Sequence, residues 1–270
     1  MKKQANISKE HLLYLKKVRG KSLLINLLRL SVLIFIIGFW ELSARLEWVN
    51  PFITSSPSRI AKTIAGLYND GTLFFHVGTT LWETALGFVI AVALGYSIAL
   101  LLWWSEIFRR VSEPYFVVLN ALPKIALGPL IIIWCGTGNE AIVFMTVLIG
   151  LIVTILNMLN GFMATDPNKL LLLRSMGAKK WQILTKLVIP SSLPSFISML
   201  KINVGMAWIG SIMGEYIVSK AGLGYLIVYG GQVFKLDLVM TATVILCVLA
   251  GVMYFLVALL EKLTVKSDET

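Results

Sequence analysis

Residues 141–165, AIVFMTVLIGLIVTILNMLNGFMAT, form the longest uncharged run of the sequence and decide its fold class. An α-helix needs about 20 consecutive apolar residues to cross the hydrocarbon core of a bilayer. Two further uncharged runs, 84–104 and 238–260, reach the same length. Only 14% of the 270 residues are charged, whereas a soluble domain has about 25%. The sequence therefore predicts an all-α integral membrane protein.

Six membrane spans are expected. Four of them read as continuous helices, at 23–42, 79–104, 141–161 and 238–260. Two are interrupted by prolines or by charged and polar residues: 114–134, with Pro123, Lys124 and Pro129, and 191–213, with Lys201 and Asn203. Irregular backbone and ionisable groups at membrane depth survive only inside protein or along a cavity. The two interrupted spans are therefore expected in the interior of the bundle.

The distribution of Lys and Arg predicts the orientation, because cytoplasmic loops carry an excess of these residues. With the N-terminus inside, the cytoplasmic segments carry seven basic residues within 1–21, then Arg109, Arg110, Lys169, Arg174, Lys179, Lys180, Lys186, Lys262 and Lys266. The opposite side keeps only Arg45, Arg59, Lys62, Lys220 and Lys235. Both termini are thus expected in the cytoplasm, with a basic flank (1–22), a transmembrane domain (23–262) containing a cytoplasmic loop (166–190), and a short tail (263–270).

Catalytic and metal-binding patterns are missing from the sequence. His11 and His76 are isolated, and Cys135 and Cys247 have neither CxxC spacing nor neighbouring ligands, so no metal site is predicted. The tripeptide Gly20-Lys21-Ser22 lacks the first glycine and the preceding strand of a phosphate-binding loop. The net charge of +10 is explained by the cytoplasmic segments, and no nucleic-acid partner is expected.

The loop 166–190 is too long and too patterned for a simple connector. Asp166-Pro167 is typical of a helix start, Gly177 interrupts the helix, and a second helix is expected to begin near Lys179. In that second helix, Trp181, Leu184 and Val188 form an apolar stripe, and Pro190 is expected to end it. Such a stripe either lies on the lipid surface or fits a groove of a soluble partner.

At these residues, the pattern G-A-x(9)-V-I-P-x-x-L-P over 177–194 resembles the cytoplasmic signature loop of ABC-importer permease subunits. The resemblance implies that short coupling helices dock into a cleft of an ATPase subunit. The implied coupling residues are Arg174, Met176, Gly177, Ala178, Lys179, Trp181, Leu184, Val188 and Pro190. The family pattern begins with Glu-Ala-Ala, whereas this chain has Leu171-Leu172-Leu173, which removes the acidic contact.

The resemblance extends over roughly 40–262. The segment ALPKIALGPLIIIWCG (121–136) is similar to the P-x-x-A-x-x-P-L-x-x-x-W-x-G pattern of the nitrate, sulfonate and taurine permease group. Glu215, followed by Gly222-Leu-Gly224, matches a second motif of that group, and Pro51 with Ser56-Pro57-Ser58 matches its first outer loop. The resemblance therefore implies a type I ABC importer-like permease with six transmembrane helices.

This resemblance also implies the partners. Two permease copies, a homodimer in the simplest case, would line a central pathway in the bilayer of a prokaryotic cell membrane. Each copy would dock one ATPase carrying ATP and Mg²⁺, while the chain itself would bind no cofactor. A separate extracytoplasmic binding protein would deliver the solute. The favoured cargo is a sulfonate, taurine or nitrate anion, with a pyrimidine or flavin vitamin precursor as the alternative. An ATPase-independent secondary transporter is the competing class.

Polar residues within the spans are candidates for the translocation pathway: Asn120, Pro123, Pro129, Asn157, Lys201, Asn203 and Glu215. Several have a second interpretation. Glu215 and Lys201 are also compatible with interfacial side chains, and Asn157 with an interhelical hydrogen bond. The pair Gly210 and Gly214, spaced as GxxxG, predicts a close helix contact.

Overall fold

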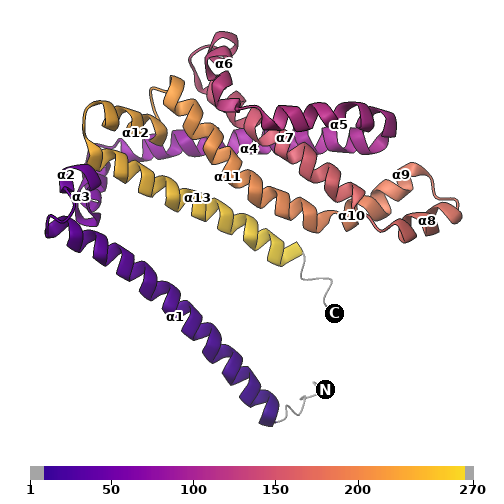
Figure 1. Ribbon diagram of the computed structural model, residues 1–270, viewed down its shortest axis with the longest axis horizontal. Helices are drawn as coiled ribbons and strands as arrows, with labels where there is room; N and C mark the ends of the chain where they lie inside the picture. Colours follow the sequence, from indigo (N-terminus) through magenta and orange to yellow (C-terminus); the bar gives the residue numbers. More distant parts are fainter. Residues whose placement is uncertain (1–8, 265–270) are drawn as a thin grey trace.

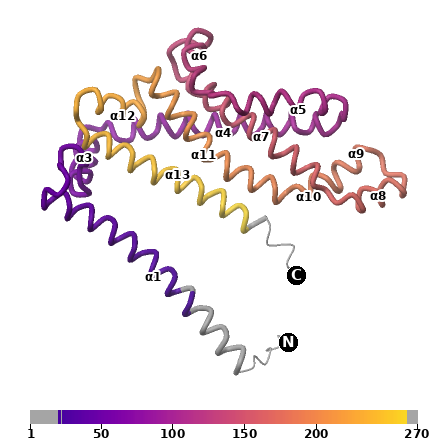
Figure 2. The backbone as a smooth tube through the Cα atoms, viewed as in Figure 1, coloured from indigo at the N-terminus to yellow at the C-terminus, as the bar shows by residue number. Residues whose placement is uncertain are grey.

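The computed structural model describes the backbone of residues 9–264 and the side chains of residues 20, 21 and 23–262. Figure 2 draws in grey the residues whose side chains are not described. Predictions for residues 1–8 and 265–270 therefore fall outside the described part of the chain.

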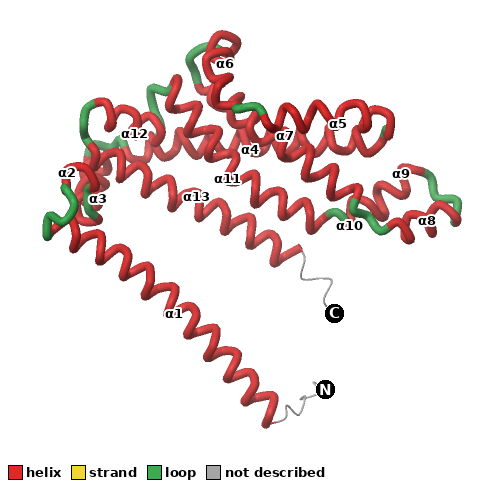
Figure 3. The backbone as a smooth tube through the Cα atoms, viewed as in Figure 1, coloured by secondary structure: helices red, strands yellow, loops and turns green. Residues whose placement is uncertain are grey.

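Five helices of the described chain are long and apolar enough to cross a membrane: α1 (Lys9–Arg45), α4 (Leu73–Trp104), α7 (Asn139–Met163), α11 (Leu193–Val218) and α13 (Leu236–Thr264). A sixth span is broken: α5 (Glu106–Ala121) continues through the 3₁₀ turn η1 (Lys124–Leu127) into α6 (Gly128–Cys135) with a bend of 87°. The shorter elements are α2 (Pro51–Thr54), α3 (Pro57–Asn69), α8 (Pro167–Ser175), α9 (Lys180–Ile183), the π-helix η2 (Leu184–Val188), α10 (Ile189–Ser191) and α12 (Leu223–Gln232). Figure 3 shows the same chain as helices joined by short loops.

The count of six spans is confirmed when the bent pair is taken as one span. One expectation about these spans is wrong, because α11 is a single unbroken helix. Pro194 lies in its first turn, where a proline costs no hydrogen bond. Lys201 is compatible with the helix because it forms a 2.5 Å ion pair with Glu261 of α13. Asn203 donates to the hydroxyl of Thr154 on α7 at 2.8 Å.

Helix α7 packs between α4 and α11 and forms the centre of the bundle (Figure 1). Glycines of α4 lie directly against threonines of α7: a Cβ on Gly87 would stand 2.5 Å from Thr146, and a Cβ on Gly95 would stand 2.5 Å from Thr154. From the first contact to the second, the residue number rises by eight on α4 and by eight on α7. The two helices therefore run parallel at close range. These contacts leave no room for a larger residue at either glycine.

Helix α11 approaches α7 through its predicted glycine pair. A Cβ on Gly210 would lie 2.6 Å from the Cα of Thr146, and one on Gly214 would lie 2.9 Å from the Cα of Ile142. The predicted close contact at this GxxxG spacing is therefore confirmed. Because the contacted atoms belong to the backbone of α7, the neighbour cannot yield by a simple side-chain rotation.

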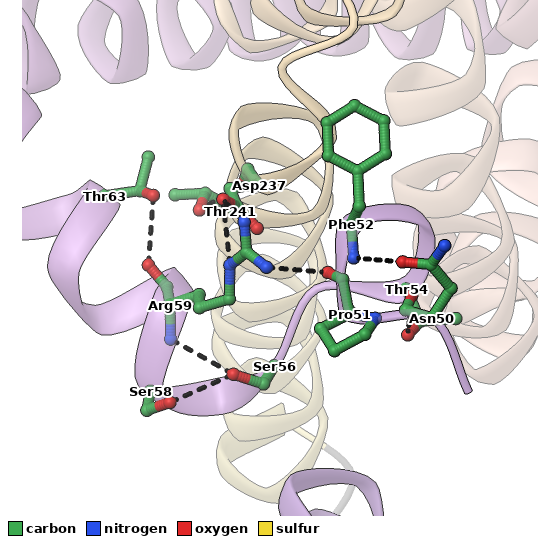
Figure 4. A network of polar contacts seen from close by, with 10 residues as sticks. All are labelled: Asn50, Pro51, Phe52, Thr54, Ser56, Ser58, Arg59, Thr63, Asp237 and Thr241. Atoms are coloured by element: carbon green, nitrogen blue, oxygen red, sulfur yellow. Dashed lines mark hydrogen bonds and ion pairs between the residues drawn. The ribbon is translucent and has the colours of Figure 1, made fainter. Parts of the chain in front are cut away.

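A polar network at one end of the bundle ties α2 and α3 to α13 (Figure 4). The guanidinium of Arg59 donates to Asp237 at 2.8 and 3.1 Å and to the carbonyl of Pro51 at 3.0 Å. Asn50 caps α2 and Ser56 caps α3. Helix α1 packs against α2 and α3 at this end, and its side chains at 23–39 are all exposed (Figure 1).

The close approach at Gly210 predicts a stability effect. The substitution Gly210→Ala should destabilise the protein by about 1–3 kcal/mol, because the added methyl overpacks the backbone of α7. Thermal unfolding of the detergent-purified protein measures this change. Gly205→Ala on the same helix is the matched control, since nothing lies within 4 Å of its added Cβ. Equal unfolding midpoints for the two variants would contradict the packing role of Gly210.

Candidate functional site

The loop 166–190 projects from the end of the bundle as two short helices, as predicted (Figure 1). Asp166 caps α8 by accepting the N–H of Asn168 at 2.8 Å. Gly177 has φ +76°, a left-handed conformation that favours glycine, and it separates α8 from α9. The next helix starts after Lys179, whose N–H donates to Gln182 at 2.8 Å. We call the unit formed by α8 and α9 the knuckle.

The predicted apolar stripe does not face outward. Leu184 and Val188 are buried, at 3% and 0% exposure, and they pack with Leu102 of α4 and Phe162 of α7. These two residues therefore anchor the knuckle to the bundle and are not available to a partner. Trp181 is the exception, at 62% exposure. The bundle itself therefore covers the Leu184 and Val188 part of the predicted stripe.

Pro190 does not end the helix, contrary to expectation. The chain passes from α9 through the π-helical turn η2 and α10 into α11 with one non-helical residue before Leu193. In η2 the N–H of Ile189 bonds to the carbonyl of Leu184, five residues back. This wider turn replaces the regular backbone hydrogen bonds just before Pro190. In a regular α-helix, Pro190 would remove one of these hydrogen bonds and its ring would clash with the preceding turn. Gly177, and not Pro190, is the structural break.

The exposed apolar residues of the knuckle are Leu171, Leu172, Met176 and Trp181, with exposures between 59% and 73%. We call these four residues the knuckle tip. Leu170 and Leu173 of the same helix pack against the core, so α8 is held on one side and bare on the other. An apolar patch that projects from a helical knuckle marks a contact surface. Leu171 and Leu172 stand where the family pattern has Glu-Ala. The sequence alone shows that they depart from this pattern but not that they form a contact surface.

Lys180 connects the knuckle to α4. Its ammonium donates to the carbonyl of Trp104 at the C-terminus of α4 and lies 5.8 and 5.5 Å from the rings of Trp103 and Trp104. A cation at the C-terminal end of a helix is favourable, and aromatic faces add to the attraction. A displacement of the knuckle is therefore passed to the end of a membrane span.

Three of the seven pathway candidates lie at the break between α5 and α6. Asn120, Pro123 and Pro129 are exposed there. Lys124 begins η1, and its ammonium donates to the backbone carbonyl of Asn120 at 3.1 Å. No ion pair of Lys124 occurs within the described residues. The break thus combines irregular backbone, an amide and an uncompensated cation on one open face.

The other candidates are used inside the bundle. Asn203 is buried against Thr154 and Met199, and Asn157 donates to the carbonyl of Val153 at 2.8 Å. Lys201 is paired with Glu261. In the single chain Asn203 and Lys201 join neighbouring helices, as expected of intramembrane polar residues. The hydrogen bond of Asn157 stays within α7 and is not the interhelical bond that was the alternative for this residue. These residues are not brought together with Asn120, Pro123 and Pro129.

Glu215 holds the start of α12. All four N–H groups that open this helix bond to side chains of other helices. Gly222 donates to His76 (3.1 Å), Leu223 to Thr80 (2.8 Å), and Gly224 and Tyr225 to one carboxyl oxygen of Glu215 (2.5 and 3.3 Å). A Cβ on Gly222 or Gly224 would collide with this carboxyl group. The motif linking Glu215 to Gly222-Leu-Gly224 is therefore a helix clamp.

Glu83 completes this cluster, and sequence reasoning missed it. It lies on α4 with no exposed surface, and its carboxyl group meets that of Glu215. Neither of its oxygens has a hydrogen-bond partner among the described residues. Two carboxylates are both acceptors, so a hydrogen bond between them requires a shared proton. The signal was an acidic residue within an otherwise apolar span, LWETALGF (81–88).

Comparison with known proteins agrees with this arrangement. Residues 87–266 match the family model described as the inner membrane component of binding-protein-dependent transport systems. The formylaminopyrimidine transport permease protein ThiX of Halalkalibacterium halodurans is 34% identical over 186 residues, which cover 69% of this chain and 74% of that protein. The aliphatic sulfonates transport permease protein SsuC of Bacillus subtilis, whose assignment is itself given as tentative, is 27% identical over 86% of this chain and 84% of its own.

A solved structure supports the fold. A chain of a bacterial ABC transporter involved in the import of the acidic polysaccharide alginate superposes with a TM-score of 0.63. The superposition covers 95% of this chain and 99% of that chain, at 14% sequence identity. At this identity the likeness concerns the arrangement of helices alone.

The clamp on α12 generates a prediction. Glu215→Ala should destabilise the protein by about 1–3 kcal/mol for each buried N–H that loses its acceptor. Glu83→Gln should unfold close to the wild type, because its amide donates to Glu215 without a shared proton. Thermal unfolding, together with hydrogen exchange of 219–225, measures both changes. Exposed Glu140→Ala is the control, and a Glu215→Ala midpoint equal to it would refute the clamp.

Proposed function

The chain belongs to the family of binding-protein-dependent transport system inner membrane components, and we propose that its knuckle tip is where an ATPase docks. Membership makes the chain a multi-pass permease subunit of an ABC importer and not an enzyme, since ATP hydrolysis belongs to a separate subunit. The same membership leaves an ATPase-independent secondary transporter without support. The observation that carries the docking proposal is the bare apolar surface of the knuckle tip.

The knuckle has the mechanical properties that a coupling element needs. Leu184 and Val188 are fixed in the core, Lys180 is bonded to the end of α4, and Gly177 supplies the sharp turn. Movement of a docked ATPase would therefore be transmitted to α4 and α7. A bound nucleotide shifts such an equilibrium only by binding the two states with different affinity. ATP and Mg²⁺ act in this scheme on the ATPase, and the permease carries the motion.

A second permease copy is proposed to cover the face formed by α5 and α6. Irregular backbone is not stable against lipid and requires protein or a water-filled cavity beside it. In the single chain Leu122 and Pro123 at the break are exposed, as are the large side chains Tyr115 and Trp134. Two copies joined at this face would enclose a pathway lined by Asn120, Pro123 and Lys124. We propose a homodimer, in the membrane of a prokaryotic cell with both termini cytoplasmic and the α2–α3 end toward the binding protein.

The cargo is proposed to be a small anion, such as a sulfonate. Lys124 supports this proposal because it places a positive charge at the break of a span, and no carboxylate within the described residues neutralises it. Charged residues within membranes mark ion and substrate pathways. The similarity to SsuC agrees with an anionic cargo. Lys201 does not support it, since its charge is paired with Glu261.

A second candidate cargo is a pyrimidine vitamin precursor. The observation that favours it is the 34% identity to a permease named for formylaminopyrimidine. Such a cargo is recognised by hydrogen bonds and ring stacking and does not require a cation in the pathway. The two candidates therefore differ in their dependence on Lys124.

Replacing both exposed leucines, as Leu171→Asp with Leu172→Asp, should abolish co-purification of the ATPase in mild detergent. The reason is that the charges disrupt an apolar contact without touching the packed side of α8. Mass spectrometry identifies the ATPase by its nucleotide-binding sequence and reports the ratio of subunits, with two permeases and two ATPases expected. Lys169→Asp on the same helix is the control. Retention of the ATPase by the double variant at wild-type level would exclude the knuckle tip as its docking site.

Charge at the break of the span predicts a transport effect. Lys124→Gln should lower the uptake of a labelled small sulfonate about tenfold, which corresponds to about 1.4 kcal/mol. Lys124→Arg should retain most of the uptake, and Lys220→Gln, outside the spans, is the charge-matched control. Uptake is measured in proteoliposomes that contain the whole transporter with its binding protein. Full sulfonate uptake by Lys124→Gln contradicts the anion proposal, and preferential uptake of an aminopyrimidine supports the second candidate.

A further inference from the structure

A basic pocket of about 460 Å³ lies between the knuckle and the ends of α4, α5 and α7. Its cationic residues are Arg109 at the start of α5, Arg174 on α8 and Lys180 on α9. Apolar side chains, among them Phe162 and Ile183, form its floor and are almost fully buried. The pocket thus joins a positive rim to an apolar base.

The positive charge of this pocket is largely uncompensated. Arg174 has no ion-pair partner among the described residues, and Arg109 lies 3.7 Å from Glu113, a distance that leaves its other nitrogens free. Glu106 also lines the pocket, but its carboxylate is paired with Arg110 at 2.6 Å. Three cations therefore face one acid that already has a partner. An anionic group is the complementary ligand.

The depth of the pocket relative to the bilayer indicates the kind of anion. The parallel spans α4 and α7 both end beside it, and Trp103, which lines it, is a residue type that concentrates at the membrane interface. The pocket is therefore level with the lipid headgroups. Basic pockets between helices at this level bind phosphate-bearing headgroups.

The pocket and the knuckle tip use different sides of α8. On α8 the pocket residues are Leu170 and Arg174, which are four positions apart and share one face of the helix. Leu171 and Leu172 of the knuckle tip point to other sides of that helix. The pocket and the knuckle tip therefore share no residue.

We propose that the basic pocket binds the headgroup phosphate of an anionic phospholipid. Arg109 and Arg174 contact the phosphate oxygens, and the acyl glycerol lies on the apolar floor. Because the pocket joins the knuckle to α4, α5 and α7, the lipid would stiffen the connection between the knuckle and the spans. This inference goes beyond the proposed function and does not depend on the nature of the cargo.

The test measures binding of dioctanoyl phosphatidylglycerol to the full-length chain in a neutral detergent, by native mass spectrometry. The variant Arg109→Gln with Arg174→Gln is expected to bind roughly 30-fold more weakly than the wild type, from a loss of between about fivefold and about sixfold for each charge at a lipid surface. It leaves Lys180 and its bond to Trp104 intact. The matched control, Lys169→Gln with Lys186→Gln, removes the same charge from the same loop outside the pocket and is expected to bind like the wild type.

Four outcomes overturn the proposal. Equal losses in the pocket and control variants would indicate general attraction, and equal binding of dioctanoyl phosphatidylcholine by the wild type would remove the role of net charge. Competition by inorganic phosphate as strong as that by the lipid would identify a free-anion site. Loss of lipid binding when the ATPase is added would assign the pocket to an acidic group of that subunit. Unchanged thermal unfolding of both variants without lipid verifies that they are folded.

Discussion

The backbone-to-backbone approach of α7 to α4 and α11 is the constraint on which the bundle depends. Lipid tails are as apolar as the helices, so helix association in a membrane relies on close packing and on interhelical hydrogen bonds. Gly87 and Gly95 of α4, and Gly210 and Gly214 of α11, bring both neighbours against α7. The polar contacts of Asn203 and of the α12 clamp are formed at this short range. Larger residues at these glycines would separate all of these contacts together.

Polar groups within the spans fall into two sets with different consequences. Glu215, Asn203 and Lys201 each have a hydrogen-bond or ion-pair partner on another helix or on α12 of the same chain, so they stabilise the bundle. The groups at the α5–α6 break have few partners in the single chain. Polar residues that have partners within the chain hold the helices together. Polar groups at the α5–α6 break remain available to a second chain or to a solute.

Much of the fold was predictable from the sequence because span length and charge distribution are strong constraints in a membrane protein. The six spans, the start of α8 at Asp166 and the turn at Gly177 all followed from local patterns. The direction of the Leu184–Val188 stripe did not, since a periodic pattern identifies a face without showing what covers it. The π-turn before Pro190 and the pairing of Glu83 with Glu215 depend on neighbouring helices, which no local pattern reveals.

Helix α1 has a geometric consequence of its own. Its 37 residues span about 55 Å at 1.5 Å per residue, and it meets the other helices near α2 and α3, at one end. It therefore acts as a long arm with a pivot: a tilt of about 10° at that end displaces the other by about 10 Å. The joint is held by Glu41, which accepts the N–H of Ser58 at 3.0 Å and pairs with Arg45 at 2.7 Å. The contacts of Glu41 thus help to set the direction in which the whole helix extends.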